Sequence, residues 1–291
     1  MRILVTGAAG KIGSRVVPEL AKHGHTVLAL DRRPMPAEVR STAEVLYADL
    51  TDSLAILNAA QGCDAIAHLG AIPQPYVPAD QLLQLNVIGT QNVLEAARAE
   101  NISKVVLTSS VGALGFSFPT HPCLPDYLPI DTQHPRRPQD IYGLSKLMNE
   151  ESAAAMTRLC GMTTIVIRPP AVWDLERAKQ QGWLKRTLER HGEDRDTSLW
   201  GYIDVYDQAI AFRLALESRL TGHYVFYTMV DDLGVNATVA ELTERHFPQL
   251  LPYLDCLTGN TFYDLAPARE QLGFVAERTW RKVLEEGTDL K

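Results

Sequence analysis

The sequence predicts an α/β protein with a doubly wound parallel sheet and a smaller C-terminal lobe. Three observations favour this fold class. Short, almost entirely apolar runs alternate with amphipathic segments through residue 169, a rhythm typical of a parallel sheet with helices on both faces. A glycine-rich turn directly follows the first apolar run. A chain of 291 residues with 46% hydrophobic composition can also bury a large core.

The strands are recognised as short runs rich in β-branched residues. They are expected at residues 3–6, 26–31, 45–48, 65–69, 105–109 and 163–168. The helices are expected where apolar residues recur every three or four positions. They are expected at residues 12–23, 80–100 and 139–159. A proline-rich loop, residues 119–138, precedes the third helix.

The alternation of apolar runs and amphipathic segments changes after Pro169, where a polar, helical stretch begins. An amphipathic helix is expected over residues 202–217, and the lobe is completed by a strand and two helices, expected at residues 222–228, 238–247 and 264–274. We therefore predict a large domain over residues 1–169. Residues 170–291 are predicted to form mainly the small lobe, interwoven with the large domain, with some segments returning to it.

Composition and charge exclude several classes of partner. The net charge of -7 and the scattered basic residues argue against nucleic acid and an anionic membrane. No apolar run is long enough to span a bilayer, and the N-terminus lacks the pattern of a signal peptide, so a cytoplasmic protein is expected. The four cysteines lie far apart, which predicts reduced, buried thiols and no metal site. A small-molecule substrate is the expected partner.

The glycine-rich turn consists of Gly7, Gly10 and Gly13 between a strand and a helix. In a dinucleotide-binding turn, the first glycine allows the tight turn, the second lets the backbone approach a pyrophosphate, and the third allows close helix packing. The phosphates would rest on the amides of the following helix. The order of strand, turn and helix predicts a Rossmann dinucleotide site and makes residues 1–169 the dinucleotide-binding domain.

An acidic residue ends the second predicted strand, about twenty residues after the glycines. Asp31 is placed to accept hydrogen bonds from a ribose diol, and its charge repels a 2′-phosphate, so NAD is favoured over NADP. Arg32 and Arg33 follow it. A guanidinium stacked on adenine can also hold a phosphate, so these residues leave NADP open as the less favoured cofactor.

Tyr142 and Lys146 are four positions apart and project from one face of a predicted helix. An isolated pair of this kind is usually a half-buried tyrosine with a lysine lying along the surface. A lysine beside a tyrosine also lowers the pKa of the phenol and suits it to acid–base catalysis. Hydroxyl groups of residues 108–110 end a predicted strand at the edge where doubly wound folds bind ligands, which favours the catalytic interpretation.

Together these motifs resemble the extended short-chain dehydrogenase/reductases, the NAD-dependent epimerase/dehydratase family, over nearly the whole chain. The matching segments are the glycine turn of residues 7–13, Asp49-Leu50, His68-Leu69-Gly70-Ala71, the helix start Asn86 to Asn92, the pair Tyr142 and Lys146, and residues 167–173. Ser110 matches the family's serine by its spacing to Gly115.

The resemblance implies roles for these residues. Tyr142 would carry the proton, Ser110 would orient the substrate, and Lys146 would bind ribose during hydride transfer at a hydroxyl carbon. The cofactor would be bound by Gly7, Gly10, Lys11, Ile12, Gly13, Asp31, Arg32, Asp49, Leu50, Leu69, Gly70, Ala71, Asn86, Tyr142, Lys146 and Pro170. His68 is interpreted as a packed strand residue.

The segment between Pro170 and Tyr202 departs from the family pattern. It is short and acid-rich, and it lacks the loop that grips a sugar nucleotide in the family's epimerases and dehydratases. The trimmed lobe is similar to that of uronate dehydrogenases, which act on free sugar acids. A carboxylate substrate needs a basic partner, and Arg168 is the candidate beside Ser110 for substrate binding, although a structural arginine is as common there.

We therefore expect an NAD-dependent oxidoreductase or epimerase acting on a sugar or sugar derivative. An NADPH-dependent reductase of a small ketone or aldehyde is the main alternative, and a non-catalytic dinucleotide sensor is a further one. The helices expected over residues 80–100 and 139–159 commonly form a four-helix dimer interface in this family, and their alanine-rich surfaces suit close packing. A homodimer is expected.

Overall fold

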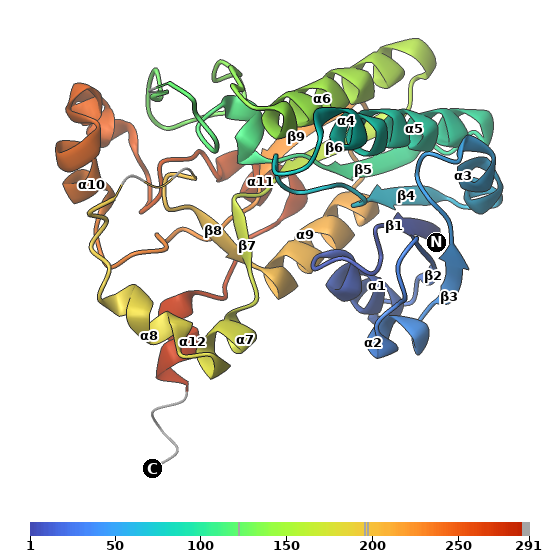
Figure 1. Ribbon diagram of the computed structural model, residues 1–291, viewed down its shortest axis with the longest axis horizontal. Helices are drawn as coiled ribbons and strands as arrows, with labels where there is room; N and C mark the ends of the chain where they lie inside the picture. Colours follow the sequence, from blue (N-terminus) through green and yellow to red (C-terminus); the bar gives the residue numbers. More distant parts are fainter. Residues whose placement is uncertain (122, 195, 197, 287–291) are drawn as a thin grey trace.

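The computed structural model describes residues 1–121, 123–194, 196 and 198–286. In this part of the chain, seven parallel strands form one sheet with the order β3-β2-β1-β4-β5-β6-β9 (Figure 1). In that order the strands are Glu44–Tyr47, Thr26–Asp31, Arg2–Thr6, Ala65–His68, Lys104–Thr108, Thr163–Arg168 and His223–Tyr227. The strand order reverses between β1 and β4, and in such sheets ligands bind outside the carboxyl ends of the strands at this point.

Helices cover both faces of the sheet (Figure 1). One face carries α1 (Gly13–Lys22), α2 (Ala37–Arg40), α9 (Val205–Glu217) and α11 (Ala266–Leu272). The other face carries α3 (Ser53–Ala60), α4 (Ala79–Leu83), the π-helical turn η1 (Gln84–Ile88), α5 (Gly89–Ala99) and α6 (Ile141–Cys160). These layers confirm the predicted doubly wound α/β fold.

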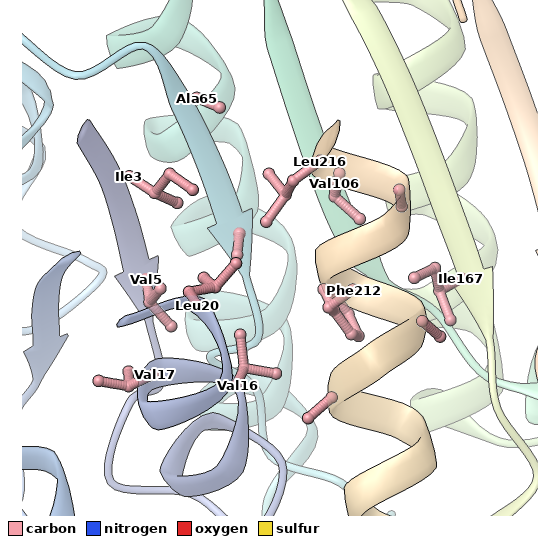
Figure 2. Packing of buried hydrophobic residues seen from close by; sticks show 14 of the residues in the cluster. Ile3, Val5, Val16, Val17, Leu20, Ala65, Val106, Ile167, Phe212 and Leu216 are labelled. Atoms are coloured by element: carbon pink, nitrogen blue, oxygen red, sulfur yellow. The ribbon is translucent and has the colours of Figure 1, made fainter. Parts of the chain in front are cut away.

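The main core lies between the sheet and the helices α1 and α9. Val16 and Leu20 of α1 and Phe212 of α9 pack on apolar strand residues such as Val5 and Ile167 (Figure 2). All five side chains are fully buried. Burying a side chain of this size contributes roughly 1.5 to 3 kcal/mol, so this layer holds the first strand and its turn rigidly in place.

The small lobe is built around a second, two-stranded parallel sheet of β7 (Ala171–Trp173) and β8 (Tyr202–Asp204). Trp173 stacks on Tyr202 with 4.4 Å between ring centroids, and Trp280 is fully buried. The helical elements of this lobe are α7 (Leu175–Gln180), α8 (Trp183–Leu188), α10 (Val239–His246), η3 (Pro248–Cys256) and α12 (Trp280–Glu285).

Several details differ from the sequence predictions. Residues 202–204 were expected to begin a helix but form β8. Residues 223–227 were expected in the lobe, yet β9 pairs with β6 and extends the main sheet. The helix expected over residues 80–100 contains the π-helical turn η1. Cys63 is buried as predicted, but Cys160 and Cys256 are exposed. Within the described residues, no helix is long and apolar enough to cross a membrane.

Candidate active site

The glycine turn after β1 contacts the loop that follows β4. Gly7 has φ +70°, and a Cβ atom added to it would lie 2.5 Å from the backbone nitrogen of Gly70. A Cβ atom on Gly13 would lie 2.2 Å from the carbonyl oxygen of Gly7. Both distances exclude a side chain. The turn is therefore compact because two backbone segments approach each other at the carboxyl edge of the sheet.

A cavity of about 360 Å³ opens over this turn. It is lined by the predicted cofactor residues Gly7, Gly10, Lys11, Ile12, Gly13, Asp31, Arg32, Leu50, Leu69, Gly70 and Ala71, together with Leu30, Arg33, Ala48, Ile72, Pro73 and Leu85. The backbone N–H groups of Lys11 and Ile12 have no hydrogen-bond partner among the described residues. Free amides at a helix start beside a long cavity fit a pyrophosphate, so these residues fit a dinucleotide.

Asp31 lies at the cavity, and both of its carboxylate oxygens accept hydrogen bonds. It accepts a hydrogen bond from Ala9 N at 3.1 Å and others from the backbone and guanidinium of Arg33. Arg32 instead pairs with Asp49, at 3.1 Å between Nη1 and Oδ2. Hydrogen bonds from the Thr51 backbone help to hold the pKa of Asp49 below its usual value. Asp49 does not line the cavity, while its neighbour Leu50 does.

Asn86 lies in the π-helical turn η1 and is fully buried. Its Oδ1 accepts a hydrogen bond from Ile72 N at 2.8 Å, and its Nδ2 donates to Ile72 O at 3.0 Å. The same Nδ2 donates to Ser145 Oγ of α6 at 3.1 Å. Asn86 therefore positions the loop that ends the cavity and ties it to α6. The structure gives it a supporting role for the predicted cofactor site.

Ser110, Tyr142 and Lys146 come together between the end of β5 and the first two turns of α6. Ser110 Oγ accepts a hydrogen bond from Gly112 N at 2.9 Å. Its hydroxyl and the ring of Tyr142 lie side by side next to Gly112. Lys146 Nζ donates to Thr108 O at 2.9 Å and lies 5.7 Å from the centre of the Tyr142 ring. Asp140 caps α6 by accepting a hydrogen bond from Gly143 N.

Burial dominates the acid–base properties of this trio. Burial raises the pKa of Tyr142 to about 12, although the hydrogen bond from Ser110 favours the phenolate. Burial also lowers the pKa of Lys146 to about 8. The prediction that the lysine lowers the pKa of the phenol is therefore wrong for the chain by itself, because desolvation of the phenolate is the larger effect.

Arg168 does not face a substrate site. Its side chain is 1% exposed. Its Nε and Nη2 donate to the two carboxylate oxygens of Glu150 at 2.8 and 2.7 Å, and its Nη1 donates to Tyr227 Oη at 3.2 Å. A guanidinium held in this way cannot also bind a substrate carboxylate. The prediction of a substrate-binding role is corrected: Arg168 is the structural partner of a buried acid. Pro170, predicted near the nicotinamide, is buried between β6 and β7.

Two aromatic residues beside the trio were missed in the sequence. The rings of Phe118 and Tyr142 meet edge to face, with 6.2 Å between centroids, and Tyr76 meets Phe118 in the same way at 5.9 Å. Tyr76 is 75% exposed. The rings form a wall that leads from the predicted catalytic hydroxyl to solvent. Both residues lie in loops without a motif, so spacing in the sequence carried no signal for them.

His68 is a packed strand residue. It is 4% exposed, and its ring nitrogens bond to the hydroxyls of Thr6 at 2.7 Å and Thr90 at 2.9 Å. Burial lowers its pKa to about 3. The imidazole is therefore neutral in the folded protein near neutral pH. This agrees with the interpretation of His68 as a packed residue.

This burial makes stability depend on pH. The folded pKa of about 3 lies below the ordinary histidine value of 6.5, so protons bind preferentially to the unfolded chain as the pH falls below 6.5. Acidification from pH 7 to 5 should therefore lower the free energy of unfolding by about 2 kcal/mol through this group. Urea unfolding at pH 7 and at pH 5 measures this change in the free energy of unfolding. His68→Gln should show a smaller loss, and an equal loss in both proteins would contradict the prediction.

The family comparison follows from this geometry. A model of the NAD-dependent epimerase/dehydratase family matches residues 3–226. The chain belongs to this family. The matched residues run from β1 to β9 and include the glycine turn and the trio Ser110, Tyr142 and Lys146. The family is NAD-dependent by its description, in agreement with the predicted cofactor.

Individual relatives within the epimerase/dehydratase family differ in activity. A uronate dehydrogenase from Pseudomonas syringae pv. tomato is 33% identical over 57% of this chain and 58% of its own length. The chain thus spans less than two thirds of that enzyme. A 2-alkyl-3-oxoalkanoate reductase from Stenotrophomonas maltophilia is 33% identical over 76% of this chain and 67% of its own. Among solved structures, MoeE5 in complex with UDP-glucuronic acid and NAD is 25% identical, with a TM-score of 0.72, covering 98% of this chain and 97% of that one.

Proposed function

We propose that this protein is an NAD-dependent oxidoreductase that transfers hydride at a hydroxyl carbon of a sugar or sugar derivative. One observation carries the proposal: a hydroxyl, a phenol and an ammonium, from Ser110, Tyr142 and Lys146, converge at the sheet edge that also holds a dinucleotide-shaped cavity. These groups can move the proton of a substrate hydroxyl while a hydride leaves the carbon that bears this hydroxyl.

The protein's own groups have distinct tasks in this reaction. Bound NAD supplies the acceptor for the hydride. Tyr142 Oη in its phenolate form takes the proton of the substrate hydroxyl, and Ser110, whose hydroxyl lies beside that phenol, orients the substrate oxygen. The ammonium of Lys146, four residues after Tyr142 on the same helix face, would hold ribose hydroxyls of the bound cofactor. Tyr142 is 8% exposed, so little bulk water competes with the substrate for its phenol.

A free sugar acid is the leading substrate class. The short segment between Pro170 and β8 leaves little chain to grip a nucleotide diphosphate, and uronate dehydrogenases are among the similar proteins. Residues 1–169 are proposed as the dinucleotide-binding domain. Residues 170–291 are proposed as mainly substrate-binding, with α9 and β9 serving the main sheet.

One screen distinguishes the dehydrogenase from an epimerase, a reductase and a dinucleotide sensor. The protein is mixed with NAD or NADP and with free uronates, neutral sugars or UDP-sugars, and separately with NADPH and small ketones, while absorbance of the reduced cofactor is followed. Reduction with uronates supports the dehydrogenase. Interconversion of UDP-sugars without net reduction supports an epimerase. Consumption of NADPH with small ketones supports the reductase alternative, which the 2-alkyl-3-oxoalkanoate reductase relative favours. Dinucleotide binding without any turnover supports the sensor.

Cofactor choice should depend on Asp31. Asp31→Ala removes the carboxylate that lies on the cavity and leaves Arg32 and Arg33. Hydrogen bonds to charged groups contribute roughly 1.5 to 3 kcal/mol, so the dissociation constant for NAD should rise at least about tenfold. NADP should lose less affinity or gain some, because a negative charge near its 2′-phosphate is gone.

Titration of both cofactors measures this change. Asp64→Ala is the matched control, because Asp64 also accepts a hydrogen bond from a backbone nitrogen, that of Arg2 at 2.6 Å, but does not line the cavity. An equal loss of NAD and NADP affinity in Asp31→Ala would show that the carboxylate does not choose between them.

We also propose a homodimer through the outer faces of α5 and α6. A cavity of about 460 Å³ lies between them and is lined by Gln91, Glu95, Ser152, Ala155, Met156, Arg158 and Leu159. Leu159 is 69% exposed and Met148 is 41% exposed, and apolar side chains on such a face favour association.

Sedimentation should give twice the 32.2 kDa chain mass, and Leu159→Asp should shift the measured mass toward that of the monomer. A wild-type monomer would contradict the proposal. The cytoplasmic location stays a prediction.

A further inference from the structure

Glu150 is a buried carboxylate that no catalytic role described above uses. It lies one helical turn after Lys146 and two turns after Tyr142, so the three share one face of α6. Its side chain is 1% exposed. One carboxylate oxygen, Oε1, accepts hydrogen bonds from Ser109 Oγ at 2.5 Å and Arg168 Nε at 2.8 Å. The other, Oε2, accepts from Arg168 Nη2 at 2.7 Å and Arg136 Nη1 at 3.0 Å.

Three successive turns of α6 face three consecutive residues where β5 ends. Lys146 donates a hydrogen bond to the backbone of Thr108, and Glu150 accepts one from Ser109. Tyr142 lies beside Ser110. Glu150 therefore fastens α6 to the residue directly before Ser110, while Lys146 fastens it to the residue before that.

The partners of Glu150 also come from separate parts of the fold. Arg168 ends β6, and Arg136 belongs to the proline-rich loop that leads into α6. Arg136 also pairs with Glu151, and its side chain is 30% exposed. The carboxylate thus joins two neighbouring strand ends, the entry loop and the helix at one point. A displacement of any of them changes the distance between Ser110 and Tyr142.

Electrostatics link the same residue to Lys146. Burial lowers the pKa of Lys146, and the negative charge of Glu150 opposes that effect. An ion pair this deeply buried is weak evidence for stability, because apolar residues of similar volume often replace such a pair without loss. Its position suggests a role in the geometry of the site instead.

We propose that Glu150 is a positioning residue that holds Ser110 opposite Tyr142 and Lys146. This inference rests on the proposed function for its kinetic consequence, but its structural consequence does not. Without the carboxylate, the end of β5 and the face of α6 are free to move apart, which moves Ser110 away from Tyr142. Small displacements of reacting groups that must be aligned lower the reaction rate about 10- to 100-fold.

The test compares four forms of the full-length protein. Glu150→Gln removes the charge but keeps the shape. The double variant Glu150→Met with Arg168→Met replaces the ion pair by apolar side chains. Glu217→Gln is the matched control, because Glu217 also accepts charged hydrogen bonds, from Arg213 and His25, but lies on α9. The measurements are thermal unfolding, NAD affinity, kcat and amide hydrogen exchange of residues 108–112.

Glu150→Gln and the double variant should each lower kcat at least about tenfold and speed exchange of residues 108–112. NAD affinity should stay within about threefold of the wild type, because the residues lining the cavity are unchanged. The double variant should unfold near the wild-type temperature. Glu217→Gln should match the wild type in kcat and in exchange of residues 108–112.

A double variant with wild-type kcat and exchange would show that the pair only stabilises the fold and would overturn the inference. So would Glu150→Gln with unchanged kcat and exchange, or failure of both variants to fold. If the wild type turns over no substrate, the proposed function fails, and hydrogen exchange alone still decides whether Glu150 positions residues 108–112.

Discussion

Tyr142→Phe should lower kcat by about three orders of magnitude, within the range of about 10²- to 10⁴-fold that general acid–base catalysis contributes. The substitution removes one oxygen, the phenol oxygen that lies beside Ser110. It keeps the ring that packs against Phe118. The fold and NAD binding should therefore survive, and the loss should appear in kcat and in kcat/KM, because the proton transfer is needed only in the transition state.

Single-turnover reduction of NAD with the best substrate from the screen measures this effect. Tyr127→Phe is the matched control. Tyr127 also carries a hydrogen-bonded hydroxyl, donating to Asp131 at 2.8 Å, and its pKa is likewise raised to about 12. The control should keep kcat within about twofold. Equal behaviour of wild type and Tyr142→Phe, with dinucleotide still bound, would reject catalysis and favour the sensor.

Gly7→Ala should cost about 2 to 5 kcal/mol of stability, because the left-handed backbone costs roughly 1 to 2 kcal/mol and overpacking roughly 1 to 3 kcal/mol, and it should abolish NAD binding. A Cβ atom at this position would lie within 2.7 Å of three backbone atoms of Leu69 and Gly70. The backbone cannot yield without separating the turns after β1 and β4. Because these turns line the cavity together, the cofactor site should be lost along with the stability.

Gly62→Ala separates the two causes of this cost. Gly62 has φ +68°, nearly the +70° of Gly7, but a Cβ atom there would meet nothing within 4 Å. The Gly62→Ala variant should therefore lose only roughly 1 to 2 kcal/mol of stability, the cost of the left-handed backbone conformation. It should still bind NAD. Urea unfolding and NAD titration of both variants give the comparison. Equal losses would mean that the close approach of Gly70 contributes nothing.

The features that could be predicted from the sequence are local ones. The glycine turn requires three glycines at fixed spacing between a strand and a helix, and the structure places all three on the cavity. Tyr142 and Lys146 share a face because a helix has a fixed period. Ser110 could be placed near them because carboxyl ends of parallel strands meet at one edge. The central sheet was predictable because each buried strand is an apolar run of its own.

The tertiary structure decided which polar groups remain free to act. Arg168 has the right position in the sequence for substrate binding, but Glu150, 18 positions away in the chain, takes up its guanidinium. The pKa of Tyr142 rises because surrounding segments bury it. Asn86 bonds to Ile72 and supports the loop that lines the cavity. β9 joins the main sheet because β6 offers it an unpaired edge. Hydrogen-bond partners and burial depend on residues distant in the chain, whereas helical period and turn chemistry depend on neighbours. The sequence by itself therefore determined the doubly wound fold and its motifs, and only the packed chain determined the charge and the partners of each group.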